Sequence, residues 1–117
     1  MDDHTTIASY REFWPYYLNE HRRPQTRALH FAGTAAATGL IAACVATANL
    51  WLLLAAAVAG YGPAWFAHFA VEKNRPATFR YPLWSLISDF RMAGTWLAGG
   101  LQRELERAGI QAPVTRR

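Results

Sequence analysis

A long block of sequence without a single charge constrains this chain more than any other feature. Between Ala28 and Val71 there is no Asp, Glu, Lys or Arg, so all 20 charged residues lie outside these 44 positions. A helix needs about 20 apolar residues to cross the hydrocarbon core of a bilayer. The block is therefore long enough for two spans. Asn49 is the strongly polar residue near its middle, and it divides the block into helices at about 28–47 and 51–71. We predict a hairpin of two membrane-spanning helices.

The composition agrees with this separation of apolar and charged sequence. Hydrophobic residues make up 52% of the chain, yet the mean hydropathy is only −0.04. The alternative is a hairpin buried inside a soluble protein. A chain of 117 residues has little other material with which to cover such a hairpin. We expect one domain over 1–117, with a core at about 10–107 and loose termini.

Amphipathic helices are expected on both sides of the hairpin. Residues 5–20 have apolar residues at helical spacing; Ser9 and Glu12 have the spacing of a capping box, and Pro15 is expected to start or kink the helix. Pro82 opens a last predicted helix at about 83–107, which we expect to lie on the membrane or dip into it. Its apolar stripe comprises Leu83, Leu86, Ile87, Phe90, Gly94, Leu97, Leu101 and Leu105. The predicted fold class is all-α, a small membrane helical bundle.

Glycine, alanine and proline refine the predicted hairpin. The first span is rich in Gly and Ala, including Gly33, and small residues allow helices to approach closely in lipid. The second span contains Pro63, which predicts a kink. Cys44 is the single cysteine, so neither a disulfide nor a cysteine-based metal site is expected.

The positive charges flank the apolar block. The net charge is +4 and the pI about 9.7. Nucleic-acid binding is disfavoured, because these residues do not form a stripe on a polar helix. The flanking residues are Arg22, Arg23 and Arg27 before the block, and Lys73, Arg75 and Arg80 after it. The positive-inside rule then predicts that both termini are cytoplasmic, in what we expect to be a bacterial inner membrane. The first 25 residues carry charges throughout, so no cleavable signal peptide is expected.

Three histidines and a carboxylate are expected to converge at the cytoplasmic end of the hairpin. His30 lies 19 residues before Asn49 and His68 lies 19 residues after it, which places both at one depth. His21 lies just outside the first span, and Glu72 lies one helical turn beyond His68. Imidazole suits Fe, Zn, Cu and Ni, and a carboxylate favours iron within this set.

These residues also fit simpler interpretations without a metal. Each histidine, taken singly, also fits a side chain that reaches the membrane interface, and Glu72 also fits a surface partner of Lys73 or Arg75. His4 lies near the N-terminus, and we expect it to take no part in a site.

Two longer motifs resemble the signatures of a known family. The first is Tyr17-Leu18-Asn19-Glu20-His21-Arg22-Arg23-Pro24 followed by Arg27–Thr34. The second contains Trp65, His68-Phe69, Glu72–Phe79, Pro82-Leu83, Ser85 and Asp89-Phe90. Together they resemble the Mpo1-like family of iron-dependent 2-hydroxy fatty acid dioxygenases, over roughly residues 10–93.

The resemblance implies an enzyme that removes one carbon from a 2-hydroxy fatty acid with O2, as in fatty acid α-oxidation. It implies Fe(II) as the cofactor, with His21, His30 and His68 at the family's metal-binding positions. Tyr81 stands where many relatives have histidine, a departure that bears on the ligand set. From their charge and position, Arg22, Arg27, Lys73 and Arg75 are candidates to bind the substrate carboxylate, or to anchor the hairpin to lipid phosphates.

Two other functions compete with this interpretation. One is a lipid-binding or scaffolding membrane protein without enzymatic activity. The other is a zinc hydrolase, because three histidines can bind zinc and leave a position open. The oligomeric state stays open, with a homodimer among the options, and membrane lipids are expected partners.

Overall fold

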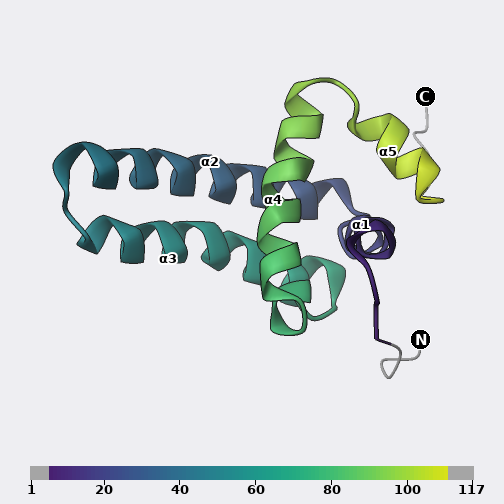
Figure 1. Ribbon diagram of the computed structural model, residues 1–117. Coiled ribbons are helices and arrows are strands. Elements are labelled where there is room, and N and C mark those ends of the chain that lie inside the picture. Colours follow the sequence, from purple (N-terminus) through teal and green to yellow (C-terminus); the bar gives the residue numbers. More distant parts are fainter. Residues whose placement is uncertain (1–5, 111–117) are drawn as a thin grey trace. The chain divides into compact units, whose positions relative to one another are not determined.

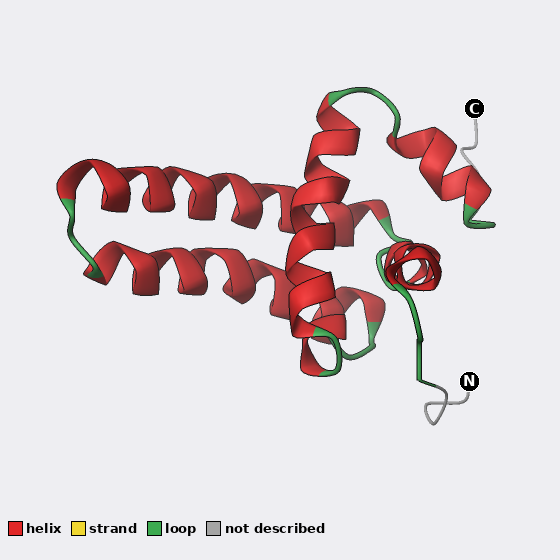
Figure 2. Cartoon of the chain, viewed as in Figure 1, coloured by secondary structure: helices red, strands yellow, loops and turns green. Residues whose placement is uncertain are grey.

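A computed structural model describes residues 6–110, and all of its regular elements are helices (Figures 1 and 2). They are α1 (Tyr10–Asn19), α2 (Pro24–Thr47), α3 (Trp51–Phe66), the π-helix η1 (Ala67–Glu72), the 3-10 turn η2 (Ala77–Phe79), α4 (Pro82–Leu97) and α5 (Leu101–Arg107). The chain forms two compact units. We call His21–Pro76 the hairpin unit, and 6–20 together with 77–110 the aromatic unit. The all-α prediction is confirmed.

In the hairpin unit, α2 and α3 lie side by side in antiparallel directions, and η1 continues α3 (Figure 1). The turn between α2 and α3 is short and is stabilised by its own backbone conformation and hydrogen bonds. Ala48 has the left-handed backbone conformation that ends α2, with φ of 57°. Asn49 Oδ1 then accepts a hydrogen bond from the backbone N–H of Trp51, at 3.1 Å. The predicted break at Asn49 is confirmed, and the first helix begins earlier than predicted because Pro24 opens it.

Glycine allows the two helices of the hairpin to approach closely. A Cβ atom added to Gly33 would lie 3.0 Å from the carbonyl oxygens of both Ala59 and Gly60. A Cβ added to Gly60 would lie 3.4 Å from the Cβ of Ala37. Real Cβ atoms are rarely found so close to a backbone oxygen, so the contact at Gly33 requires glycine. The small residues of the sequence thus form a helix–helix seam.

Both arms of the hairpin are long and apolar enough to cross a membrane, over Pro24–Thr47 and Trp51–Glu72. Large apolar side chains cover much of their outer surface. Val45 and Trp51 are 79% and 77% exposed. Exposed apolar surface on this scale is unusual for a protein in water and suits contact with lipid.

The aromatic unit packs α1 against α4 and α5. Ser9 caps α1 by accepting a hydrogen bond from the Glu12 backbone N–H at 3.3 Å, as the capping-box spacing predicted. Pro15 lies inside α1, which begins at Tyr10 and is shorter than the predicted 5–20. The core of the aromatic unit contains the buried side chains of Phe13, Tyr17, Leu18, Met92, Leu101 and Leu105.

Polar contacts hold one face of α4 to α1. The Tyr10 hydroxyl lies 2.8 Å from the Ser88 hydroxyl, and the Tyr17 hydroxyl donates to Asp89 at 2.5 Å. Burial raises the pKa of Tyr17 well above its usual value, and the negative charge of Asp89 raises it further. Tyr17 is therefore a neutral hydrogen-bond donor over the physiological range.

The prediction of a single last helix is wrong, because the structure has two helices there, α4 and α5. Gly99 has φ of +84°, a conformation that glycine adopts without strain, and it ends α4 two residues before α5 begins. The predicted apolar stripe divides with it. Leu101 and Leu105 on α5 are buried, whereas the stripe residues of α4 are exposed.

Two glycines in α2 provide a matched test of the helix seam. Gly33→Leu should lower the thermal stability of the detergent-solubilised protein, because the side chain would collide with the α3 backbone. Gly39→Leu should be nearly silent, since a Cβ at Gly39 meets no atom within 4 Å. Leu53→Ala, at a half-exposed position, should also change little. Equal melting temperatures for the two leucine variants would contradict a close seam.

Candidate metal centre

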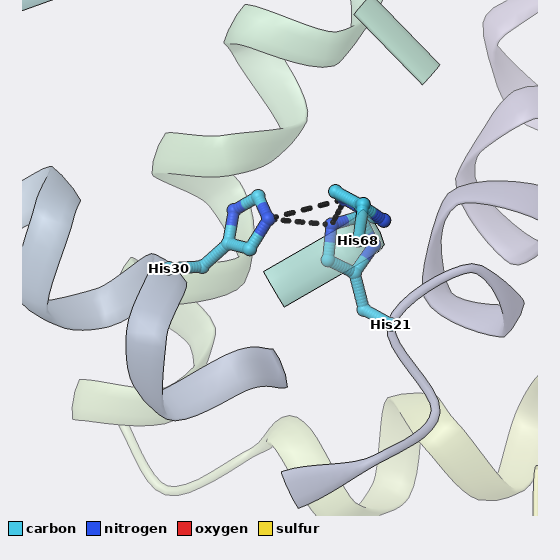
Figure 3. A group of neighbouring side chains, drawn as sticks. All are labelled: His21, His30 and His68. Carbon is cyan, nitrogen blue, oxygen red and sulfur yellow. Dashed lines mark hydrogen bonds between the residues drawn. The ribbon is translucent and has the colours of Figure 1, made fainter. Parts of the chain in front are cut away.

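Three buried histidines bring their Nε2 atoms together in the hairpin unit (Figure 3). The Nε2 of His21 lies 3.1 Å from that of His30 and 3.0 Å from that of His68, and the His30–His68 distance is 3.2 Å. His30 comes from α2, His68 from η1, and His21 from the segment before α2. The sequence prediction that these three converge is confirmed.

The triangle of nitrogens cannot be satisfied by hydrogen bonds alone. Each ring nitrogen is either a donor or an acceptor, and each contact needs one of each. Among three nitrogens that all contact one another, at least two have the same role, so at least one contact is unfavourable. A cation that binds all three lone pairs removes this conflict. The three histidines could therefore hold a metal ion.

The turn that follows η1 orients His68. Its Nδ1 lies 2.7 Å from Asn74 Oδ1, and an amide oxygen only accepts, so Nδ1 carries the proton. In a neutral ring Nε2 is then unprotonated, and its lone pair can bind a metal. The backbone supports the contact, because the His68 carbonyl accepts from the N–H of both Lys73 and Asn74. Lys73 has φ of 64°, and this left-handed residue folds the chain back over His68.

A pair of charged side chains fixes the segment that carries His21. The Arg27 guanidinium donates through Nη1 to the carbonyl oxygens of His21 and Arg22, both at 2.9 Å. Glu72, the last residue of η1, accepts from the backbone N–H of Arg23 at 2.7 Å. These contacts link the start of α2 to the end of η1. They give a loop residue, His21, a defined position beside two helical ones.

His30 lies on the face of α2 that is directed into the unit. Thr26, His30 and Gly33 follow at helical spacing and are all buried. The Thr26 hydroxyl is fully buried and has no hydrogen-bond partner among the described residues. The carbonyl four residues before it, on Arg22, accepts from Arg27. A buried hydroxyl without a partner, one turn from a metal-site histidine, is suited to bind a ligand or a water.

The spacing of the nitrogens fits a bound transition metal. Nitrogens about 2.1 Å from one ion lie about 3.0 Å apart at right angles and about 3.4 Å apart in a tetrahedron. The observed 3.0–3.2 Å falls within this span. Neutral imidazole is a common ligand for Fe, Zn, Cu and Ni. The residues present therefore fit a metal held on one side by three nitrogens, with other positions open.

The other predicted site residues lie around this centre in different roles. Glu72 is not a member of the histidine group, whose ligand atoms lie within 4.8 Å of one another. Arg27 contacts backbone carbonyls of the His21 segment. Arg22, Lys73 and Arg75 are exposed in the same unit. His4 lies outside the described residues.

Tyr81 belongs to the aromatic unit. Its hydroxyl accepts from the backbone N–H of Ile7 at 3.0 Å, and its ring stacks on Trp84. It therefore has a structural role at the start of α4. Sequence reasoning also missed Thr26 and Asn74 as members of the site, although Asn74 lies within a quoted motif.

Comparison with known families agrees with this site. The family described as 2-hydroxy-palmitic acid dioxygenase Mpo1-like matches residues 7–101. The chain belongs to this family. The match covers all three histidines together with Thr26 and Asn74. No curated protein and no solved structure matches the chain. The family is that of a dioxygenase, which accords with a metal centre.

Asn74 offers a test of how His68 is oriented. Asn74→Leu removes the acceptor for Nδ1–H and should lower the affinity for Fe(II) or Co(II) by about 10–100-fold, the usual effect of losing such a partner. Asn74→Asp retains an acceptor and should keep most of the affinity. Anaerobic titration of the metal-free protein measures both.

A second amide on the same unit provides the control. Gln25 is exposed at the start of α2, and Gln25→Leu should leave metal affinity unchanged. An Asn74→Leu variant that is folded and binds metal like the wild type would show that the hydrogen bond does not orient His68 for binding.

Proposed function

We propose that this protein is a membrane-embedded, Fe(II)-dependent dioxygenase that shortens 2-hydroxy fatty acids by one carbon. In the overall reaction a 2-hydroxy acid and O2 give the acid one carbon shorter, CO2 and water. The observation that carries the proposal is the triangle of histidine nitrogens, 3.0–3.2 Å apart and buried. Membership of a family of 2-hydroxy-palmitic acid dioxygenases supports the reaction class and favours iron over zinc.

Each of the three histidines has one task in this proposal, which is to present an unprotonated Nε2. Iron bound there supplies open coordination positions and the transfer of electrons from substrate to O2, which side chains alone do not provide. Asn74 keeps the His68 ring in the required tautomer. Arg27 and Glu72 hold the His21 segment in place, so we assign Glu72 to support of the site through Arg23.

The substrate has a charged head and an apolar tail, and the hairpin unit offers surfaces for both. Exposed cationic side chains lie at its ends, on Arg22, Lys73 and Arg75, and they attract a carboxylate. The buried Thr26 hydroxyl has no partner among the described residues and could donate to a substrate oxygen. The exposed apolar surface of α2 and α3 suits an acyl chain that arrives from lipid. We infer that the substrate reaches the site from the membrane.

We further propose that the hairpin spans a bacterial inner membrane with both termini in the cytoplasm. The uncharged turn at Asn49 is easier to translocate than the two basic ends. Reporter domains inserted at Asn49 and fused to the C-terminus should therefore report opposite sides of the membrane. Reporters that fall on the same side would exclude a hairpin that crosses twice.

Substitution of the histidines tests the metal and the reaction together. His21→Ala, His30→Ala and His68→Ala should each abolish O2-dependent loss of one carbon, and each should lower bound iron from one equivalent to near zero. Anaerobic purification followed by metal analysis and product mass spectrometry gives both readouts. His4→Ala should keep full iron and full activity.

The same measurements separate the competing functions. Bound zinc with O2-independent hydrolysis would indicate a zinc hydrolase. A wild-type protein without any metal, or histidine variants that all retain iron, would exclude this centre. A lipid-binding or scaffolding protein would then be the better assignment.

A further inference from the structure

Helix α4 carries an apolar stripe that the described residues of the aromatic unit leave exposed. Its members are Leu83, Leu86, Ile87, Phe90 and Leu97, which are 44–77% exposed. They lie three, four, seven and fourteen residues from Leu83, so they share one face of the helix. We call this face the α4 stripe.

The opposite side of α4 is committed to the aromatic unit. Ser88 contacts the Tyr10 hydroxyl, Asp89 accepts from Tyr17, and Ser85 and Met92 are buried. These contacts prevent α4 from rotating to bury the stripe in its own unit. The stripe can therefore be buried only by an apolar environment outside the aromatic unit.

The connection between α4 and the hairpin indicates that this environment is the membrane. The second candidate span ends at Glu72, and α4 begins ten residues later, at Pro82. A chain of that length reaches at most about 35 Å when fully extended. The N-terminal side is shorter still, because α1 ends at Asn19 and the first candidate span begins at Pro24. With the hairpin in a bilayer, α4 cannot leave the neighbourhood of the membrane surface.

The residues around the start of α4 suit that surface. Lys73, Arg75 and Arg80 in the connecting segment are exposed and cationic. Phe79 is 50% exposed, and Trp96 near the other end of α4 is 51% exposed. Exposed cations favour anionic head groups, and exposed aromatic side chains favour the boundary between head groups and acyl chains.

We propose that the α4 stripe is an interfacial membrane-binding face, which lies in the head-group region of an anionic bilayer parallel to its surface. The aromatic unit is then attached to the membrane through α4 as well as through the hairpin. This inference rests on the proposed insertion of the hairpin, but not on the metal or the reaction.

Site-directed spin labelling of the full chain in lipid nanodiscs tests the proposal. Cys44→Ala removes the single native cysteine. New cysteines then carry a label at Leu86 or Phe90 on the stripe, at exposed Gln102 on α5, and at Val58 on the hairpin. The nanodiscs contain phosphatidylcholine and phosphatidylglycerol. Collision of each label with O2, which concentrates in lipid, is compared with collision with a water-soluble nickel chelate.

The proposal predicts a severalfold higher ratio of O2 to nickel collisions at Leu86 and Phe90 than at Gln102, at a shallower depth than Val58. Labels at Leu86 and Phe90 that resemble Gln102 would overturn it, because the stripe would then face water. Labels shielded from both reagents would also overturn it, because protein would then cover the stripe.

The Val58 label and an activity assay distinguish a failure of the α4 proposal from a failure of hairpin insertion or of the proposed enzyme. If Val58 reports lipid but Leu86 and Phe90 do not, the hairpin is inserted and only the α4 proposal fails. If Val58 also reports water, the hairpin itself is not in the membrane. Iron content and product formation by each labelled protein show separately whether the proposed enzyme is intact.

Discussion

The approach of the α2 and α3 backbones at Gly33 controls the geometry on which the histidine centre depends. Two helices with large side chains at their contact keep their backbones well apart, whereas here the position of a Gly33 Cβ lies 3.0 Å from the carbonyl oxygens of α3. Gly33 follows His30 by less than one turn. The tight seam therefore brings the His30 ring to the His68 ring, with 3.2 Å between their Nε2 atoms.

The architecture of the hairpin was predictable because it follows from charge and length. A long run without charges has few stable arrangements in a cell, and a single polar residue near its middle marks the turn. The equal distance of His30 and His68 from Asn49 was sufficient to place both at one depth. The histidine cluster could therefore be predicted from sequence before any side-chain position was known.

The details that depend on backbone geometry could not be predicted in the same way. The placement of Glu72 beside the histidines assumed α-helical spacing after His68. The structure has a π-helix there, which does not keep α-helical spacing, and Glu72 accepts a hydrogen bond from the Arg23 backbone. The role of Asn74 depends on a left-handed residue at Lys73, and that of Thr26 depends on the burial of a hydroxyl without a partner among the described residues. The division of the last helix depends on Gly99, whose conformation the apolar periodicity does not reveal.

The origin of the three histidines has a consequence for folding. His30 and His68 belong to helices, whereas His21 lies in the short segment before α2. A metal bound by all three would act as a cross-link between parts of the chain that are 9 and 38 residues apart. Binding energy gained only by the folded form adds to its stability, so the folding equilibrium and the metal concentration become linked. Without the ion, the hydrogen bonds from Arg27 and to Glu72 would still hold the His21 segment, so the metal would add to an arrangement that the chain already favours. In such a protein the supply of metal would govern the lifetime of the folded chain as well as its chemistry.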